Sequence, residues 1–433
     1  MTGEIVVVGG GAGGLELACK LGRKLGPSKV TLVDSRLYHI WKPSLHEVAA
    51  GTLDIHQEGL SYQMLAHDNG FRFVYGALSA LDAPAHAITV AAVTASDGEA
   101  LLPQRTLPYG ALVLAVGSTA NYFNVPGAAE HTIALNATED AEHFRLTLLK
   151  LLSAADQRAG EHTGKPGVDI VIIGGGATGV ELAAELREAS AVYTAYGFAH
   201  LQPLRDVRIT LLEGAPRILA PLPERVAAAA LALLGERAIA VVTDCRVAAI
   251  SADDVSDSNG KHYPADLCVW AAGIRAPAFL ATLGLETSRS GAIVVDTLLR
   301  AGGAADVYAL GDCAACTDAH GTQVPPRAQA AHQQADFLAT RLLRAAAGKA
   351  VGDQPYIYRD YGSLVSFGHA NSVGSLMGSL KGLSWFVDGF VARLMYTSLH
   401  LMHHQAVLGT VRTAVLAVAR FLIKRSTALV KLH

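Results

Sequence analysis

A ten-residue segment occurs twice in this chain, and it constrains the fold more than any other sequence feature. Gly9-Gly-Gly-Ala-Gly-Gly-Leu-Glu-Leu-Ala18 and Gly174-Gly-Gly-Ala-Thr-Gly-Val-Glu-Leu-Ala183 differ only at their fifth and seventh positions. Each copy follows an apolar run typical of a buried strand, at 5–8 or 170–173, and precedes a helical pattern. In this strand–turn–helix context the G-x-G-x-x-G spacing predicts a dinucleotide site, with the pyrophosphate at the start of the helix.

The glycines of each copy have three different roles. The first makes the tight turn, the second lets backbone N–H groups approach the pyrophosphate, and the third lets the helix pack closely on the strand. Ordinary glycine turns are the alternative, and two bracketed copies in one chain argue against them. The predicted contacts are Gly9, Gly11, Ala12, Gly13 and Gly14 in the first copy, and Gly174, Gly176, Ala177, Thr178 and Gly179 in the second.

Each copy is followed by a second strand that ends in an acid, which is expected to bind ribose hydroxyls. The first is Asp34, at the end of 30–34, and the second is Glu213, at the end of 207–213. The longer interval in the second copy is assigned to a longer helix and loop at 187–206. A carboxylate at 213 accepts from a 2′-hydroxyl and repels a 2′-phosphate, which favours NADH over NADPH. Arg217, four residues on, could offset this repulsion.

Three further apolar strands indicate how two nucleotide domains share the chain. The strand at 109–118 ends near Gly117, and the strand at 306–312 ends in Gly311-Asp312, whose carboxylate is placed to bind flavin ribityl hydroxyls. Between them, the strand at 267–273 ends in Ala272 and Gly273 and repeats the pattern for the second nucleotide. This order predicts an FAD domain, with the flavin held permanently, that is split around an inserted domain for NADH.

The predicted fold class is therefore α/β, with two Rossmann-like dinucleotide-binding domains, the NADH domain inserted in the FAD domain, and a C-terminal membrane-associating segment. The expected boundaries are 1–120 for the first part of the FAD domain, 121–165 for a helical linker, 166–288 for the NADH domain, 289–350 for the second part of the FAD domain, and 351–433 for a membrane-anchoring and dimerisation region.

Together these motifs resemble the two-dinucleotide-binding-domain flavoproteins and, within them, the type II NADH:quinone oxidoreductases. Segments 37–51, 325–333 and 431–433 are similar to the proteobacterial branch, and Ala328-Gln329-x-Ala331-x-Gln333 is similar to the family's quinone-site signature. The resemblance implies NADH oxidation, reduction of non-covalent FAD and electron transfer to membrane quinone without proton pumping. It also implies a peripheral protein on the cytoplasmic face of the bacterial inner membrane.

The residues after Pro325-Pro326 predict a helix over about 327–344 that begins near Ala328. Its N-terminal N–H groups, pointed at a flavin, would stabilise negative charge on the reduced ring. Gln329 and Gln333 lie four residues apart on one face, so both can line one slot and hydrogen-bond quinone carbonyls. The alternative is a polar helix face that is satisfied by water.

Two charged residues are further candidates for the site. The resemblance places Glu181 near the nicotinamide, flavin and quinone, where it could relay a proton. The alternative is that Glu181 only complements the helix dipole in the first turn, as Glu16 does in the first copy. Lys42, in the Trp-Lys-Pro loop, is a candidate flavin contact, or else a solvated loop lysine.

Two other patterns are weaker candidates for a functional site. Cys313-Ala-Ala-Cys316 has the spacing of a redox motif, but it follows the flavin Gly-Asp, so packing is the favoured interpretation. His400, His403 and His404 have no carboxylate or cysteine partner nearby in the sequence, so we expect an interfacial role and no metal.

Composition excludes several classes of protein. With 35 Lys and Arg against 38 Asp and Glu, no global basic field recruits nucleic acid. Five scattered cysteines fit a reducing compartment and not a disulfide scaffold. The first residues carry no export signal, and no stretch approaches the ~18 apolar residues of a spanning helix. We therefore expect a cytoplasmic chain.

The C-terminal region predicts contact with a lipid surface, where quinones dissolve. No Asp or Glu follows Asp388, and two apolar helices are expected over 385–404 and 411–423. Both are too short and too charged to span a bilayer and fit helices that lie in its interface. Ordinary dimer-forming or core-covering helices are the alternative, and a homodimer would double the membrane contact. The expected membrane residues are Trp385, Arg393, Arg412, Arg420, Lys424 and Arg425.

Two other functions compete with this interpretation. A sulfide:quinone or ferredoxin-type reductase has the same architecture, but sulfide oxidation needs cysteines beside the flavin, and Cys245 and Cys268 fall inside the predicted NADH domain. A redox-gated membrane-binding flavoprotein would use its flavin as a sensor. Such a sensor reduces its flavin once and then stalls, whereas an oxidoreductase turns over.

Overall fold

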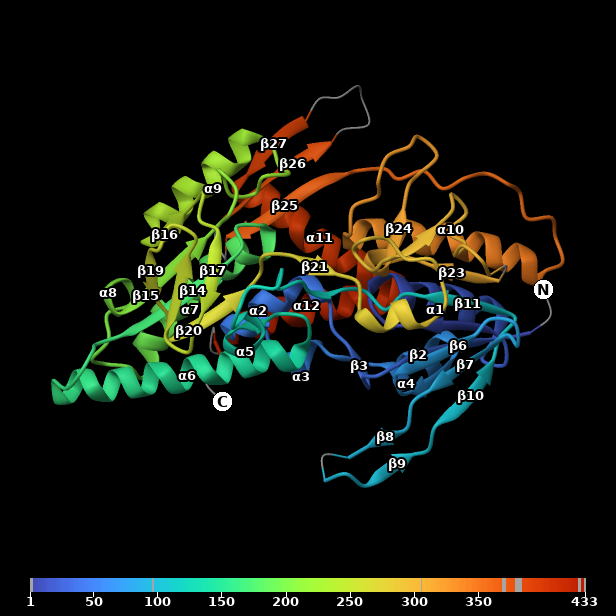
Figure 1. The fold of residues 1–433 in the computed structure, drawn as a ribbon, viewed down its shortest axis with the longest axis horizontal. Coiled ribbons are helices and arrows are strands. Elements are labelled where there is room, and N and C mark those ends of the chain that lie inside the picture. The colour runs from blue at the N-terminus through green and yellow to red at the C-terminus, as the bar shows by residue number, and fades with distance from the viewer. Residues whose placement is uncertain are drawn as a thin grey trace.

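The computed structural model describes residues 3–95, 97–304, 306–367, 371–377, 384–426 and 430–431. Two five-stranded parallel sheets form its centre (Figure 1). The first has the order β23-β11-β1-β2-β5. Because both faces of a parallel sheet are covered, its strands read as continuous apolar runs, and all four residues of β1 are buried. Its strands are β1 (Ile5–Val8), β2 (Val30–Asp34), β5 (Arg72–Tyr75), β11 (Ala111–Leu114) and β23 (Val307–Ala309).

The second parallel sheet has the order β13-β20-β14-β15-β16. The segment 121–165, expected to be a helical linker, is only partly so, because it also supplies the edge strand β13. That short strand pairs with β20 at Ile133↔Val269 and Ala134↔Trp270. The strands are β13 (Ile133–Ala134), β14 (Val168–Ile173), β15 (Val207–Leu212), β16 (Ile239–Val242) and β20 (Leu267–Trp270).

The chain leaves the first sheet after β11, builds the second sheet and returns to the first as β23. The two crossings pair with each other as β12 (Thr119–Ala120) and β21 (Ile274–Arg275), which are antiparallel. The first sheet is therefore made from two parts of the chain that are separated by the whole second sheet. This is the topology of an inserted domain.

Helices follow the glycine-rich turns and cover the sheets. In the first half α1 (Ala12–Leu25) packs against α10 (Ala328–Ala346). In the second half α7 (Ala177–Tyr196) and the short α8 (Pro203–Asp206) account for the longer interval before β15, as predicted. The remaining helices of this half are α5 (Ala128–His131), α6 (Thr138–Glu161) and α9 (Glu224–Glu236).

Smaller elements surround these sheets, and the β8–β9 hairpin projects from the body of the molecule (Figure 1). Antiparallel sheets have the orders β10-β7-β6 and β17-β18-β19. The elements are β3 (Tyr38–His39), η1 (Lys42–Ser44), α2 (Leu45–Ala50), α3 (Ile55–Glu58), β4 (Leu60–Ser61), α4 (Tyr62–Asn69), β6 (Leu78–Asp82), β7 (Ala87–Val90), β8 (Val93–Thr94), β9 (Ala100–Leu102), β10 (Arg105–Pro108), β17 (Val247–Ile250), β18 (Asp254–Asp257), β19 (His262–Pro264), η2 (Ala278–Thr282), β22 (Ile293–Val295), η3 (Gly311–Cys313) and β24 (Ala314–Cys316).

The C-terminal region is an antiparallel sheet followed by two helices. The sheet contains β25 (Gly362–Phe367), β26 (Asn371–Met377) and β27 (Ser384–Asp388), and the helices are α11 (Gly389–Leu408) and α12 (Thr410–Ser426). The helix predicted over 385–404 is therefore wrong at its start, because 385–388 pair with β26. Aromatic and β-branched residues favour a strand there. The side chains of Trp385, Arg393, Arg420, Lys424 and Arg425 lie outside the described part of the chain.

A buried carboxylate, Glu16 on α1, joins three helices. It is 1% exposed and accepts a hydrogen bond of 2.7 Å from Nδ1 of His403 on α11. Nδ1 of His332 on α10 also contacts it, and Nζ of Lys20 lies 3.5 Å away. Burial opposes ionisation, but the two histidines outweigh it and lower the pKa of Glu16 to about 2. Glu16 also lies beyond the first turn of α1, so the expected helix-dipole role describes it poorly.

The hydrogen bonds continue from His403 to the first glycine turn. Nε2 of His403 lies 2.8 Å from Nε2 of His39, whose Nδ1 lies 2.9 Å from the carbonyl oxygen of Gly10. A carbonyl only accepts, so His39 donates through Nδ1; burial lowers its pKa and keeps the ring neutral, so its Nε2 accepts. His403 thus donates from both nitrogens and carries a positive charge. Glu16 and His403 form a buried ion pair.

We predict that Glu16→Ala lowers the free energy of unfolding by about 3–5 kcal/mol at pH 7, because it leaves the His403 cation buried without its partner. Urea unfolding of the FAD-loaded protein measures this. In the wild type, the contribution of Glu16 is complete above the ordinary carboxyl pKa of 4.5 and is lost as the pH falls through about 2.

Glu139→Ala is the matched control, since it breaks an exposed ion pair with Arg36 at 3.5 Å. We expect it to change the free energy of unfolding by less than about 1 kcal/mol. Equal effects of the two substitutions would contradict a central role for the buried pair.

Candidate active site

The first glycine-rich turn is built by close backbone approach. Gly9 has φ 102°, and a Cβ added to it would lie 2.4 Å from the carbonyl oxygen of Ala115. A Cβ on Gly14 would lie 2.0 Å from the carbonyl oxygen of Gly9. A side chain at Gly13 would meet Leu310 and the backbone of Ala331. These positions accept only glycine, as the motif requires.

The middle glycine of the turn faces open space instead. No heavy atom lies within 4 Å of a Cβ added to Gly11, and α1 begins directly after Gly11 with no side-chain cap. The uncapped N–H groups at Ala12 and the following residues therefore face this space. Together with the helix dipole, they form a cradle for an anion that fits the pyrophosphate of FAD.

The second turn repeats this geometry. Gly174 has φ 113°, and its Cβ would lie 2.5 Å from Ala271, while a Cβ on Gly179 would lie 1.9 Å from the carbonyl oxygen of Gly174. Gly176 again faces open space, and α7 begins after it at Ala177-Thr178 with no side-chain cap. The structure thus holds two anion cradles of one design, one on each parallel sheet.

The strand-terminal acids hold the two turns in the same way. Asp34 Oδ2 accepts a hydrogen bond of 2.6 Å from the backbone N–H of Gly10, and Glu213 Oε2 accepts one of 2.6 Å from that of Gly175. Both acids therefore lie beside the turn that precedes them, where a ribose would follow the pyrophosphate. Burial raises the pKa of Asp34. The sequence analysis missed Gly10 and Gly175, whose N–H groups bind the acids.

Arg217 is not placed to offset the charge of Glu213. Its guanidinium donates hydrogen bonds to the carbonyl oxygens of Leu222 at 2.9 Å and Ala220 at 2.6 Å. These bonds hold the guanidinium against its own loop. Ala272 and Gly273 follow the end of β20 at Trp270, and a Cβ added to Gly273 would lie 2.8 Å from the ring of Phe123.

A second cluster lies at the carboxyl ends of β11 and β23. Ser118 Oγ donates a hydrogen bond of 2.8 Å to Asp312 Oδ2, and Lys42 Nζ donates one of 3.1 Å to the carbonyl oxygen of Ser118. Burial lowers the pKa of Lys42, although Asp312 opposes this. Gly117 and Gly311 both have positive φ, at 70° and 72°. The structure thus places Lys42, the candidate flavin contact from a loop distant in sequence, close to Asp312.

The helix α10 begins at Ala328, as predicted, with no side-chain cap. The amides of Gln329 and Gln333 share one face, and both bind the segment 359–362. Gln329 Nε2 donates to the carbonyl oxygen of Gly362 at 3.0 Å, and Gln333 Nε2 donates to that of Arg359 at 2.8 Å. The sequence analysis missed the neighbouring Gln334. Its Oε1 accepts a hydrogen bond of 2.7 Å from the backbone N–H of Gly311, which joins α10 to the turn at the end of β23.

Glu181 lies in the second turn of α7 and is 7% exposed. Its Oε1 accepts a hydrogen bond of 3.0 Å from the N–H of Ser366 on β25, and its Oε2 lies 3.7 Å from Nδ1 of His46. Burial raises the pKa of Glu181 to about 7, although His46 opposes this. For His46, burial lowers the pKa, but Glu181 and its neighbouring carboxylates outweigh burial and raise it. The pair holds a proton that is exchangeable near neutral pH.

The strand β25 connects these two parts of the site. Its first residue, Gly362, accepts from Gln329 on α10, and Ser366 donates to Glu181 on α7. The C-terminal region therefore bridges a helix of the flavin half and a helix of the NADH half. His46 and this bridge were missed from the sequence, although His46 lies in the quoted segment 37–51.

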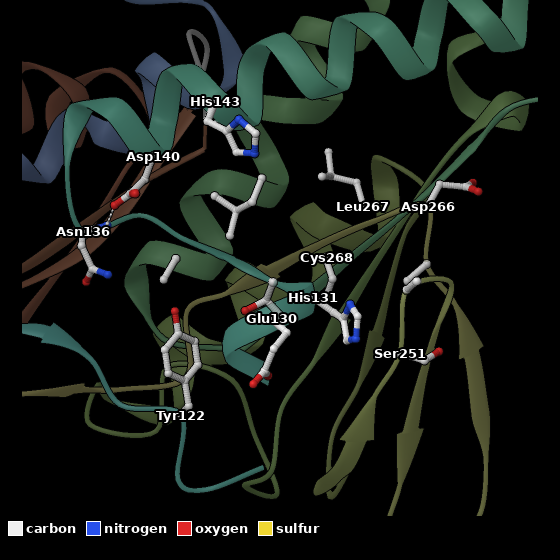
Figure 2. A pocket seen from close by; sticks show the side chains of 15 residues that line it. Tyr122, Glu130, His131, Asn136, Asp140, His143, Ser251, Asp266, Leu267 and Cys268 are labelled. Carbon is white, nitrogen blue, oxygen red and sulfur yellow. Dashed lines mark hydrogen bonds between the residues drawn. The ribbon is translucent and has the colours of Figure 1, made fainter. Parts of the chain in front are cut away.

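A pocket of about 410 Å³ opens at the edge of the second sheet, between β13, β20 and the start of α6 (Figure 2). Its labelled walls include Tyr122, Asp140, His143 and Cys268. None of its lining residues belongs to a glycine-rich turn or to the Glu181 cluster. The pocket is therefore separate from the chemistry of the nucleotide sites.

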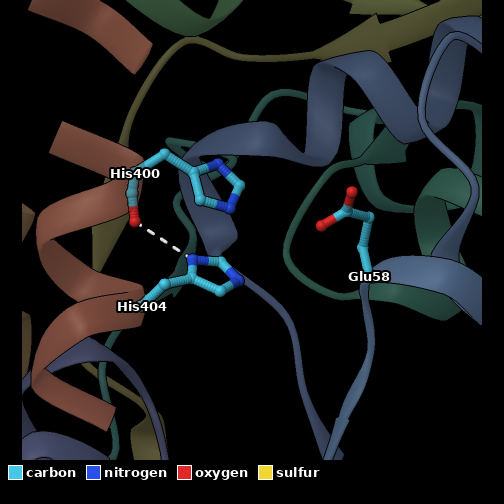
Figure 3. A group of neighbouring side chains, drawn as sticks. All are labelled: Glu58, His400 and His404. Atoms are coloured by element: carbon cyan, nitrogen blue, oxygen red, sulfur yellow. Dashed lines mark hydrogen bonds between the residues drawn. The ribbon is translucent and has the colours of Figure 1, made fainter. Parts of the chain in front are cut away.

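The three C-terminal histidines have different surroundings. His403 pairs with Glu16, while His400 and His404 face the carboxylate of Glu58 on α3 (Figure 3). No carboxylate lies near these histidines in the sequence, but the fold brings one to them on α3, from the other end of the chain.

Comparison with known proteins identifies the family. Residues 3–335 match the family model of pyridine nucleotide-disulphide oxidoreductases. The type II NADH:quinone oxidoreductase of Haemophilus influenzae is 36% identical over 445 residues, which covers 99% of this chain and all of that protein. The chain belongs to the type II NADH:quinone oxidoreductase family.

Solved structures show how widely the fold is shared. NDH2 from Plasmodium falciparum in complex with NADH is 17% identical, has a TM-score of 0.80 and covers 100% of both chains. The sulfide:quinone oxidoreductase from Aquifex aeolicus is 18% identical, with a TM-score of 0.72 over 98% of this chain and 95% of that one. At these identities the likeness shows the fold alone.

The two cysteines that have the spacing of a redox motif lie in the interior of the flavin half and do not form a disulfide. Cys313 and Cys316 are buried free thiols on η3 and β24. Burial raises the pKa of each to about 11. A reactive thiol needs a lowered pKa, so both fit the packing role that was expected.

Proposed function

We propose that this protein oxidises NADH and reduces a membrane quinone at a flavin held between its two nucleotide halves. The observation that carries the proposal is the pair of matching cradles at Gly11 and Gly176, each beside its own strand-terminal acid. Two such sites in one chain hold one resident and one exchanging dinucleotide. The five free cysteines fit the reducing compartment in which NADH is found, which supports the cytoplasmic face of the inner membrane.

Bound FAD supplies two-electron redox chemistry between NADH and quinone. The turn at Gly9–Gly14 would hold its pyrophosphate, and Asp34 its adenosine ribose. Asp312 would hold ribityl hydroxyls, with Lys42 and Ser118 fixing that carboxylate. The uncapped start of α10 would stabilise negative charge on the reduced ring through its N–H groups.

The second cradle would bind the pyrophosphate of NADH at the uncapped start of α7. Glu213 accepts a ribose 2′-hydroxyl and repels a 2′-phosphate, and Arg217 is bonded to carbonyl groups of its own loop. NADH is therefore preferred over NADPH. Direct hydrogen bonds from Gln329 and Gln333 to a quinone stay a prediction; their bonds to 359–362 position the segment that would border the slot.

Glu181 and His46 would provide a proton for quinone reduction. Formation of a quinol takes up two electrons and two protons, of which NADH delivers one proton with its hydride. A buried carboxyl with a pKa of about 7 can donate the other at neutral pH and recover it from His46. Glu181 is thus proposed as the proton relay of the site.

The C-terminal helices would bring the protein to the lipid surface. Exposed apolar residues repeat along one side of α12, at Val411, Val415, Val418 and Leu422. At about 100° per residue they lie within about 60° of one another. No described helix is long and apolar enough to cross a membrane. This stripe favours a helix lying in the bilayer interface. Arg412 pairs with Asp68 on α4 and is still more than half exposed. The expected homodimer stays a prediction.

Anaerobic mixing tests the function directly. We expect NADH to bleach the flavin absorbance faster than NADPH does, and a short-chain quinone to restore it repeatedly. Gly176→Ala places a methyl group in the NADH cradle, so it should raise the NADH concentration needed for bleaching by roughly tenfold or more without loss of FAD. Gly197→Ala, in open space at the other end of α7, should change nothing. A protein that stays colourless with added FAD, or reduces once and stalls, contradicts the proposal.

The proton relay predicts a pH dependence. The protonated form of Glu181 is the donor, so the rate of quinone reduction by the NADH-reduced enzyme should fall as the pH rises through about 7. Glu181→Gln should remove this pH dependence and slow quinone reduction on the order of 10²-fold at pH 6. Stopped-flow spectroscopy measures the rate. Glu188→Gln, which replaces a carboxyl elsewhere on α7 that pairs with Arg237 at 3.2 Å, should keep the pH profile. Full quinone turnover in Glu181→Gln at every pH would exclude the relay.

The membrane contact predicts that Val415→Glu together with Val418→Glu reduces binding to anionic phospholipid vesicles by roughly tenfold or more, because it places two carboxylates on the apolar stripe. Flotation with vesicles measures the bound fraction. Leu204→Glu removes an equally exposed leucine on α8 and should have no effect. Unchanged flotation of the double variant would contradict the assignment of α12 to the interface.

A further inference from the structure

We propose that His400, His404 and Glu58 form a binding site for a zinc-like divalent cation, which fastens α11 to α3. The three side chains each offer a ligand atom, and these atoms all lie within 4.8 Å of one another. Figure 3 shows the Glu58 carboxylate facing the two imidazole rings from the opposite side of the site. Glu58 is distant in sequence from the two histidines, so the site exists only in the folded chain.

The helix places the two histidines as a pair. They lie four residues apart on α11, which puts both rings on one face. The ring centroids are 4.4 Å apart with an interplanar angle of 22°, so the rings are nearly parallel and present their edges in the same direction. His404 is 4% exposed, which holds its ring in this orientation.

A backbone carbonyl fixes the tautomer of His404. Nδ1 of His404 lies 3.0 Å from the carbonyl oxygen of His400. Because a carbonyl can only accept, Nδ1 carries the proton and Nε2 bears the lone pair. A metal-binding histidine characteristically uses its second nitrogen in this way.

The donor set selects the class of cation. Two imidazoles and one carboxylate, with water as the fourth ligand, form a donor set that binds Zn²⁺, whereas Ca²⁺ and Mg²⁺ prefer sites made of oxygen alone. Zinc bonds of about 2.0–2.1 Å in tetrahedral geometry put ligand atoms roughly 3.3–3.5 Å apart, so small side-chain rotations close the site. A cavity of about 10 Å³, lined by all three ligand residues and by Ser44, borders the site and is roughly the size of one water molecule.

The cation would give α11 a second anchor beside the first. His403, between the two ligands in sequence, already ties α11 to Glu16 and to His39. The cation adds a bond between α11 and α3, which lies just before β4 and α4 in the first half of the chain. Bound zinc would therefore stabilise the position of the C-terminal helices against the flavin half.

The test uses the full-length FAD-loaded protein, dialysed against a chelator and then titrated with Zn²⁺ in a calorimeter. We expect one Zn²⁺ per chain with a dissociation constant in the micromolar range or below, and slower amide exchange in α11 and α3 when Zn²⁺ is bound. Glu58→Gln and His404→Gln, which keep the size of each side chain, should each weaken binding at least about tenfold. His262→Gln removes an exposed histidine 2.7 Å from Asp254 and should leave binding unchanged.

Each outcome decides the proposal. Loss of binding in both ligand variants and not in His262→Gln supports it, provided that both still contain FAD and are reduced by NADH as the wild type is. Absence of tight binding in the wild type, or equal binding in all variants, overturns it. A Co²⁺ spectrum gives a second criterion, because a tetrahedral site produces strong visible bands that Glu58→Gln would remove, and weak octahedral bands in the wild type would contradict the assigned geometry.

Discussion

The ion pair between Glu16 and His403 is the interaction on which the arrangement of this molecule depends. A charge in the interior is costly, so the fold must bring α1, α10 and α11 together tightly enough to satisfy it. The same hydrogen bonds run through His39 to the carbonyl oxygen of Gly10, whose N–H holds Asp34. The first glycine-rich turn is thus connected to a helix from the end of the chain. Displacement of α11 would disturb the peptide that positions Asp34, the acid proposed to bind the ribose.

The two nucleotide halves use the same backbone hydrogen bond to hold their acids, but different groups fix the turn that donates it. In both, the N–H of the second residue of the turn binds the acid at 2.6 Å. In the FAD half, Tyr62 and His39 also donate to the carbonyl oxygen of that residue, Gly10, so the whole peptide group is fixed. Each acid also accepts a backbone hydrogen bond from the residue two positions on, Asp34 from Arg36 at 2.8 Å and Glu213 from Ala215 at 2.7 Å. The carbonyl oxygen of Gly175 accepts from the backbone N–H of Leu219 at 2.7 Å, so side chains fix the first turn and a backbone group fixes the second.

The sequence predicted what depends on local spacing and missed what depends on distant segments meeting. The glycine turns, both acids and the start of α10 follow from strand–turn–helix patterns, and the structure has them all. The partners His46 for Glu181 and His403 for Glu16 were not predictable, because each pair joins residues from separate elements. The strand at 384–388 was misassigned for a related reason: its apolar residues also fit a helix, and only the pairing with β26 decides between the two. Glu58 beside His400 and His404 belongs to the same class of contact.

The C-terminal region therefore contains both elements that pack into the interior and an element that stays exposed. β25 and α11 enter the interior, where Ser366 binds Glu181 and His403 binds Glu16, while α12 leaves a stripe of valines and a leucine exposed. A lipid-dissolved acceptor would reach the flavin from the side on which the protein is proposed to meet the bilayer. One continuous segment carries both the helix proposed to lie in the interface and the strand that touches Glu181 and Gln329. The distance between the membrane surface and the proposed proton donor would therefore be set by covalent connection and by the buried ion pair. A separate anchoring domain on a flexible linker could not fix that distance.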